Sequence, residues 1–339
     1  MSKKKWVLIA GGLVTGTYFL FRDRPETIER KETIQKEENG LPEQIHESTF
    51  FLVTKDCLPL SLKIVEPNYR PIKAVVQVIH GVLEHSGRYL ELAHYLAKQG
   101  YAVILSDLRG HGHSIDKANP LGQMPGYQRM IADQVEITDF IKTKYPKQPI
   151  YLYGHSFGSI LARLYLQTND EKIDKLVLTG TPQFLSISKF GLVIADVAMK
   201  VTGKDKFSWI MKKLSGFGSE DKTWLTSDIE QLEKAENDPF IIPGYNNIGV
   251  ATIWEADHEL KNYAKFTCQN PELPILSITG QEDYRITGGD KGLLDTEKTL
   301  RKIGYKTVDM YNLPGMKHEV IQEIEREVVY RMITDFFET

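Results

Sequence analysis

This chain has few cysteines and no excess of basic over acidic residues. Of its 339 residues only two are cysteine, Cys57 and Cys268, and they are too far apart to form a CxxC motif. The sequence therefore supports neither a disulfide framework nor a structural zinc site. Its 42 Lys and Arg are outnumbered by 45 Asp and Glu, which leaves a formal charge of −3. Without a basic surplus, we expect no nucleic-acid partner.

Internal repeats and low-complexity tracts are also absent. The composition, with 41% hydrophobic, 10% aromatic and 26% charged residues, argues against a disordered, collagen-like or multi-span membrane chain. It is typical of a globular protein with a sizeable core. The length suits one large α/β domain with an insertion, or two domains.

Long apolar runs are missing too, with one exception at the N-terminus. Trp6 to Phe21 carries no formal charge and lies between Lys3–Lys5 and Arg22. At ~1.5 Å per residue, a helix of this length would span ~24 Å, short of a ~30 Å hydrocarbon core. We predict that residues 1–21 form an uncleaved membrane anchor, because no small-x-small cleavage site follows the run. A cleaved secretion signal and a buried or interfacial helix are the alternatives. The lysines favour an N-inside orientation, with the folded domain outside the cytoplasm.

The rest of the chain alternates between strand-like and helix-like segments. After a polar tether at 22–48, this alternation predicts an α/β fold with a mostly parallel central sheet flanked by helices. The expected strands are 74–79, 101–105, 149–153, 175–179, 274–279 and 306–311, and the expected helices are 88–100, 130–145, 159–167 and 320–337. The alternation breaks between Pro182 and Phe266. We therefore expect a first core part (49–182), a helical cap (183–265) and a second core part (266–339).

The predicted cap is rich in large apolar side chains, among them Phe190, Phe207 and Trp209. Each of them could pack the cap onto the core or line an apolar binding slot. As a set beside an active site, they favour a hydrophobic substrate.

Chemistry is indicated first by the run from Gly154 to Gly158, which has the form Gly-x-Ser-x-Gly around Ser156. It follows a predicted strand and precedes a predicted helix, as a nucleophile elbow requires. Glycines on both sides of the serine allow the sharp, crowded turn that exposes its hydroxyl. We therefore predict that Ser156 is a catalytic nucleophile.

A serine nucleophile needs an imidazole base that is oriented by a carboxylate. In a strand–elbow–helix architecture these follow the serine in the order acid, then histidine, on loops after strands. Asp283 follows the strand predicted at 274–279, and His318 follows the one at 306–311. We predict Asp283 as the acid, with the adjacent Glu282 as the alternative, and His318 as the base.

The oxyanion of the reaction needs two backbone N–H donors. We expect these from Phe157, directly after the nucleophile, and from Val82, in the loop after the strand at 74–79. Of the other eight histidines none has the place in the order that the base requires. His111 and His113 have a metal-like His-x-His spacing, but no third ligand lies at a suitable spacing, so we expect no metal.

At these residues the chain resembles the α/β-hydrolase superfamily. Within it the resemblance is to the bacterial lysophospholipase and monoacylglycerol lipase-like group, which has a serine aminopeptidase S33-type domain. It covers about Phe50 to Phe337 and rests on the run His80–Tyr89, the run Asp107–Ser114, the elbow and the order ending at His318. The cap contributes Trp224–Asp228 and Asn237–Phe240. One departure is Tyr284-Arg285, where relatives often have Pro-Val.

The resemblance implies an α/β-hydrolase fold and a triad of Ser156, Asp283 and His318. It also implies a serine carboxylic-ester hydrolase that cleaves monoacyl lipids, lysophospholipid or monoacylglycerol, through an acyl-enzyme intermediate and without a cofactor. An S33-type aminopeptidase is the enzymatic alternative, and carboxylates of the cap, Glu220, Glu230, Glu233 or Glu255, could then bind the substrate ammonium. A non-catalytic binding protein of the same fold is the alternative from another class. The expected partners are a lipid-ester substrate and, through residues 1–21, a membrane, while nothing in the sequence indicates an oligomeric state.

Overall fold

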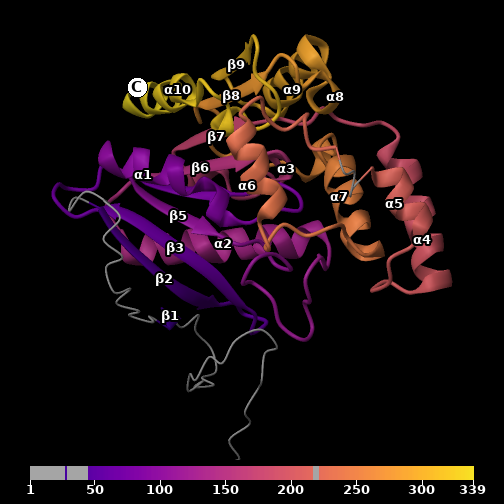
Figure 1. Cartoon of the computed structure of the whole chain (residues 1–339). Helices are drawn as coiled ribbons and strands as arrows, with labels where there is room; N and C mark the ends of the chain where they lie inside the picture. The colour runs from indigo at the N-terminus through magenta and orange to yellow at the C-terminus, as the bar shows by residue number, and fades with distance from the viewer. Residues whose placement is uncertain (1–26, 29–44, 217–220) are drawn as a thin grey trace, which may run out of the picture.

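One nine-stranded sheet organises the described part of the chain (Figure 1). The structure is a computed structural model, and it describes residues 27–28, 45–216 and 221–339. The strand order is β1-β2-β3-β5-β4-β6-β7-β8-β9. The strands are β1 (Thr27–Ile28), β2 (Ile45–Val53), β3 (Pro59–Pro67), β4 (Val75–Ile79), β5 (Ala102–Ser106), β6 (Ile150–His155), β7 (Lys175–Thr179), β8 (Ile275–Gly280) and β9 (Val308–Leu313). Strands β4 to β9 pair in parallel, whereas β1, β2 and β3 extend the sheet antiparallel along the β5 edge.

The parallel strands β4 to β8 are buried on both faces, which is why they read as largely apolar runs, whereas the edge strand β9 is mostly exposed or half-buried. In β4, for example, Val75 and Ile79 enter one core cluster and Val76 and Val78 the other. The first cluster includes side chains of α2 (Tyr127–Lys144), α3 (Phe157–Tyr165) and, to a smaller extent, α9 (Gly289–Ile303). The second is covered by α1 (Leu90–Lys98) and α10 (Arg326–Glu338). Helices on both faces of a mostly parallel sheet confirm the predicted fold class.

The segment between β7 and β8 is helical. It contains α4 (Ser188–Thr202), α5 (Trp209–Ser215), α6 (Ile229–Asn237) and α7 (Asn247–Glu259). Helix α7 packs against both α3 and α4. Helices α4 and α5 form the outer edge of the molecule on the right of Figure 1, at the opposite side from β1, β2 and β3. We call residues 183–265 the cap segment.

Two parts of the fold were not expected from the sequence. The antiparallel pair β2 and β3 begins at Ile45, so residues 45–48 of the predicted tether belong to a strand. Because β2 lies near the sheet edge, His46 and Glu47 remain partly in contact with solvent, and such polar residues hide the strand pattern. Helix α9 was also not expected. Its buried positions are few, including Leu293 and Leu300, among many charged residues.

The membrane-anchored localisation predicted from the sequence is corrected. In residues 27–28, 45–216 and 221–339, no helix combines the length and the apolar composition that crossing a membrane requires. The longest described helix, α2, has 18 residues and includes charged side chains such as Arg129 and Asp133. Residues 1–21, on which the prediction rested, lie outside the described residues. The anchor is therefore unsupported, and so is the orientation that depended on it.

Candidate active site

Ser156 lies in the turn between β6 and α3, with an unusual backbone conformation. Its φ of 51° is positive, and ψ is −119°. A residue with a side chain adopts such angles only where the surrounding structure holds it there. Here the Ser156 N–H donates to the Thr179 carbonyl of β7 at 2.9 Å, and the Ser156 carbonyl accepts from Ser159 N–H at 2.9 Å. The sharp turn predicted for this motif is confirmed.

The two glycines of the motif are required by close backbone contacts. A Cβ atom at Gly154 would lie 2.5 Å from the Gly158 carbonyl oxygen. A Cβ at Gly158 would lie 2.1 Å from the Ile79 carbonyl oxygen at the end of β4. Both distances are far shorter than a van der Waals contact, so α3 can start this close to the sheet only if both residues lack a side chain.

Asp283 and His318 form a buried hydrogen-bonded pair. Asp283 follows β8, and His318 follows β9. The His318 Nδ1–H donates to Asp283 Oδ2 at 2.7 Å, and both side chains are almost fully buried, 3% and 2% exposed. The adjacent Glu282 is exposed. The structure therefore brings together His318 and Asp283, not Glu282.

The imidazole of His318 lies next to the elbow. Its ring centroid is 4.9 Å from that of His155, the residue before Ser156. On the cap segment, the Trp224 ring lies 5.0 Å from the His318 ring. Burial lowers the pKa of His318, but the charge and hydrogen bond of Asp283 raise it by more, so the pKa lies above its ordinary value of 6.5. The carboxylate thus favours the protonated imidazole.

The loop after β4 approaches the elbow. A Cβ at Gly81 would lie 3.1 Å from the Ser156 Cβ. The Gly81 N–H donates to Glu84 Oε1 at 2.5 Å, and its carbonyl accepts from His80 Nδ1 at 2.8 Å. These two bonds hold the chain directly before Val82, the predicted oxyanion donor. We call residues 80–85 the β4 loop.

A buried cluster of charged side chains includes Glu84 of the β4 loop. Arg88 donates to Glu84 Oε2 at 3.2 Å and to Glu319 Oε2 at 2.5 Å, and all three side chains are less than 10% exposed. Tyr89 donates to Glu84 Oε1 at 2.6 Å. Because Glu319 follows His318 in the chain, this cluster joins the β4 loop to the histidine. Glu84, Arg88 and Tyr89 belong to the motif His80–Tyr89, whereas Glu319 belongs to no motif noted in the sequence, and the sequence did not indicate that these residues are partners.

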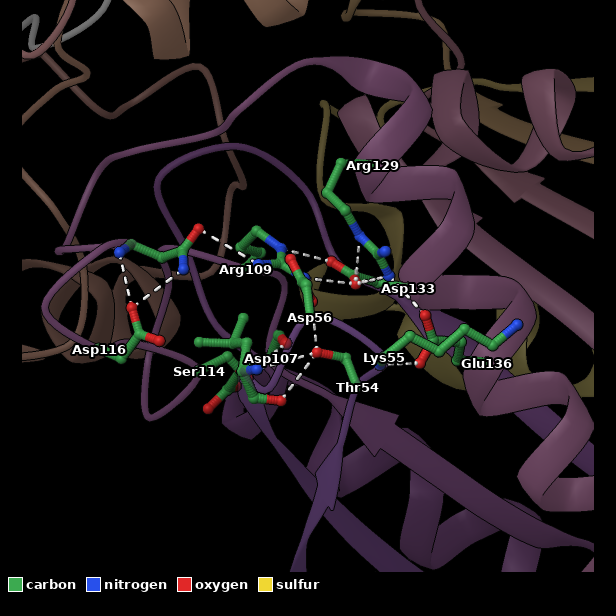
Figure 2. Close-up of polar contacts among 12 residues, drawn as sticks. Thr54, Lys55, Asp56, Asp107, Arg109, Ser114, Asp116, Arg129, Asp133 and Glu136 are labelled. Carbon is green, nitrogen blue, oxygen red and sulfur yellow. Dashed lines mark hydrogen bonds and ion pairs between the residues drawn. The ribbon is translucent and has the colours of Figure 1, made fainter. Parts of the chain in front are cut away.

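A second ion-pair network holds the loop after β5, residues 107–114. Figure 2 shows the Arg109 side chain between Asp133 of α2 and Asp56. Arg109 Nε and Nη2 donate to the two oxygens of Asp133, each at 2.8 Å, and Arg109 is 1% exposed. Asp133 also accepts from Arg129. Charge-assisted, bidentate hydrogen bonds of this kind hold the Arg109 side chain in one orientation.

The loop at residues 107–114 is hydrogen-bonded to the β4 loop and to Ser86, which directly follows it. Asp107 Oδ1 accepts from both the N–H and the hydroxyl of Ser86, at 2.9 and 2.6 Å. The Leu108 N–H donates to His80 Nε2 at 2.9 Å. The buried Arg109 network is therefore connected through short bonds to the loop beside Ser156.

Comparison with known proteins identifies the family. Residues 70–325 match the family described as serine aminopeptidase, S33. The chain belongs to the S33 serine aminopeptidase family. This confirms the resemblance noted from the sequence, and the S33 match extends over most of the core and the whole cap segment.

Several relatives of this S33 member match it over most of its length. Monoglyceride lipase of Mus musculus is 27% identical over 289 residues, covering 83% of this chain and 90% of that protein. Phospholipase YtpA of Bacillus subtilis is 27% identical over 273 residues, covering 79% of this chain and 95% of that protein. A carboxyl esterase structure from Bacillus coagulans is 24% identical, with a TM-score of 0.75, and covers 88% of this chain and 99% of that one. The structural likeness confirms the α/β-hydrolase fold.

Proposed function

We propose that this S33 protein hydrolyses carboxylic esters of monoacyl lipids, with Ser156 as nucleophile, His318 as general base and Asp283 as the acid that orients it. The observation that carries the proposal is the buried 2.7 Å hydrogen bond from His318 to Asp283, beside the elbow that presents Ser156. Asp283 accepts the Nδ1 proton, which leaves Nε2 of the neutral imidazole as the proton acceptor.

The proposed reaction has two steps. In the first, the Ser156 hydroxyl attacks the ester carbonyl while His318 Nε2 takes its proton and then delivers it to the departing alcohol. In the second, water gives its proton to the same nitrogen and attacks the acyl-enzyme; the bond to Ser156 Oγ then breaks, His318 returns the proton to that oxygen, and the fatty acid is released. The charge of Asp283 stabilises the imidazolium formed in each step. No cofactor takes part in this scheme.

We further propose that Phe157 and Val82 supply the oxyanion donors. Phe157 is the first residue of α3, and the N–H groups of a first helical turn have no acceptor within the helix. The partial positive charge at this helix start also favours an oxyanion. The position of the β4 loop against the Ser156 Cβ supports Val82 as the second donor.

The lipid substrate is supported by the cap segment and by the relatives. Large apolar side chains of α4 and α5 and the chain between them are exposed, including Phe190 (65%), Phe207 (67%) and Trp209 (74%). Among the relatives, two are named monoglyceride lipase and phospholipase. We propose that the cap segment, 183–265, receives the acyl chain of the substrate.

The described carboxylates of the cap that could bind the substrate ammonium of an aminopeptidase are exposed or bonded to other side chains. Glu230 pairs with Lys234 at 2.8 Å on the outer face of α6, and Glu255 accepts from Gln128. Glu233 is exposed on α6, and Glu220 lies outside the described residues. These surroundings favour an ester substrate over a peptide with a free ammonium group.

The test uses the purified full chain and its Ser156→Ala variant. A fluorophosphonate probe should label the wild type and leave Ser156→Ala unlabelled. The wild type should then hydrolyse monoacylglycerols and lysophospholipids, assayed with and without detergent, faster than amino-acid arylamides. Equal labelling of the two proteins would refute catalysis through Ser156, and faster arylamide cleavage would favour the aminopeptidase.

A further inference from the structure

The β4 loop is held by the cap segment through both backbone groups of Leu83. The Leu83 N–H donates to the Tyr245 hydroxyl oxygen at 2.6 Å. The Leu83 carbonyl accepts from the Ile242 N–H at 2.9 Å. Tyr245 and Ile242 lie in the chain between α6 and α7, residues 238–245, which we call the cap loop. Leu83, the residue next to Val82, is therefore held in place by the cap segment and not by β4, the strand that it follows.

The Tyr245 hydroxyl is oriented by a second partner, His111. His111 Nδ1 lies 3.0 Å from the Arg109 carbonyl, which can only accept, so Nδ1 carries the proton. Burial lowers the pKa of His111 to about 3, so the ring is neutral and its Nε2 is an acceptor. Tyr245 then donates its O–H to Nε2 at 2.7 Å and accepts the Leu83 N–H on its oxygen. Arg109 is itself held by the network of Figure 2.

Leu83 needs this support because of its backbone conformation. Its φ is 63°, in the left-handed region that residues with a Cβ atom rarely adopt. Such a conformation persists only where the surrounding bonds hold it. If Leu83 relaxed, the Val82–Leu83 peptide would turn and move Val82, whose own N–H lies in the preceding peptide. The hydrogen bonds of Leu83 thus act on the direction of a proposed oxyanion donor.

A second bond joins the same two loops. His85 Nδ1 accepts from the Gly87 N–H at 3.2 Å, so its other nitrogen donates to Asp238 Oδ2 at 2.8 Å. The His85 ring also lies 5.3 Å from the Phe240 ring. The cap loop therefore contacts the β4 loop at both Leu83 and His85.

We propose that Tyr245 is a positioning residue for acyl transfer: its hydroxyl couples the cap loop to Leu83 and keeps the Val82 N–H directed at the oxyanion. This inference rests on the proposed function. In this scheme Tyr245 acts through Leu83 and not on the reacting atoms. Its effect should therefore appear in the turnover step rather than in substrate binding.

The experiment compares four forms of the full chain: wild type, Tyr245→Phe, Leu83→Gly and the double variant. We expect Tyr245→Phe to lower kcat about 10-fold with KM changed less than about 2-fold, as for a weakened oxyanion contact. Glycine adopts a positive φ without strain. In the Leu83→Gly background, Tyr245→Phe should therefore lower kcat by less than about 3-fold. Equal effects in both backgrounds would overturn the proposal.

A matched control removes another buried tyrosine hydroxyl. Tyr305 donates to Asp170 Oδ2 at 3.1 Å and is 1% exposed, on a part of the fold that contributes nothing to the proposed site. Tyr305→Phe should keep the wild-type kcat, and a loss equal to that of Tyr245→Phe would refute a specific role. Fluorophosphonate labelling of the wild type separates the two proposals. An unlabelled wild type overturns the proposed function together with this inference, whereas a labelled wild type with unchanged kcat in Tyr245→Phe overturns this inference alone.

Discussion

His318 Nδ1 lies 2.7 Å from Asp283 Oδ2, and both side chains are almost completely removed from solvent. Residues 35 positions apart are thereby joined at the ends of two neighbouring parallel strands, β8 and β9. The carboxylate sets both the tautomer of the imidazole and its affinity for a proton. Each of these effects has a measurable consequence.

The pH dependence of activity should report the Asp283 charge. His318 acts as a base only when neutral, and its pKa lies above 6.5, so kcat/KM should fall as the pH drops through that raised value. Asp283→Asn removes the charge that raises the pKa, so the acid limb should move to lower pH. The maximal rate should fall about 10³-fold or more, because the tautomer is no longer imposed. The measurement is kcat/KM for a soluble ester between pH 5 and pH 9. An acid limb at the same pH in both proteins would contradict this account.

Gly158→Ala should disrupt the elbow. The added methyl would lie 2.1 Å from the Ile79 carbonyl, so α3 must move away from β4. We expect a loss of about 3 kcal/mol or more in the free energy of unfolding, measured by urea titration, together with loss of fluorophosphonate labelling. Gly216→Ala is the control: φ there is 69°, but apart from its chain neighbours no atom of the described residues lies within 4 Å of the added methyl. It should cost only about 1 kcal/mol, from the left-handed conformation. Similar losses for both variants would show that the close contact at Gly158 is unimportant.

Asp133→Asn should destabilise the fold strongly. It removes the charge that two arginines share in Figure 2, and leaves Arg109 buried with reduced compensation. Breaking a buried pair costs about 3–5 kcal/mol. Asp196→Asn removes a carboxylate that pairs with Lys200 on the exposed face of α4, and should cost less than about 0.5 kcal/mol. Both are measured by urea unfolding, and equal costs would refute a stabilising role for the Arg109 network.

Arg88→Met should make stability depend more strongly on pH. Burial raises the pKa of Glu319 above its ordinary value despite the opposing charge of Arg88. Without Arg88, Glu84 and Glu319 would be buried beside each other with no cation between them, so the pKa of Glu319 should rise further in the folded state. Groups with a raised folded pKa stabilise the fold below their unfolded pKa, and this stability is lost as the pH rises. The deficit relative to wild type should therefore be larger at pH 8 than at pH 5 in urea unfolding. A deficit independent of pH would argue that Arg88 acts by packing alone.

Much of the fold followed from local sequence patterns. Strands β4 to β8 are short, largely apolar runs because both of their faces are buried, and their alternation with helices predicted the parallel sheet. The Gly-x-Ser-x-Gly spacing predicted the elbow at Ser156, because a sharp, crowded strand-to-helix turn requires glycine on both sides of the serine. Strands β2 and β3 were missed, since a strand near a sheet edge carries polar residues that weaken the pattern.

The identity of the acid and the contacts of Tyr245 depend on the tertiary structure and cannot be seen in any local sequence pattern. Asp283 and Glu282 are adjacent and both carry a carboxyl group, and only the path of the chain after β8 turns Asp283 toward His318 and Glu282 toward solvent. Tyr245 carries no motif, and its role follows from a contact with Leu83 across 162 positions of the chain. Spacing along a chain sets which residues can meet at the ends of parallel strands. The directions of their side chains, and the partners that fix their protons, depend on packing between distant segments, which the sequence by itself does not display.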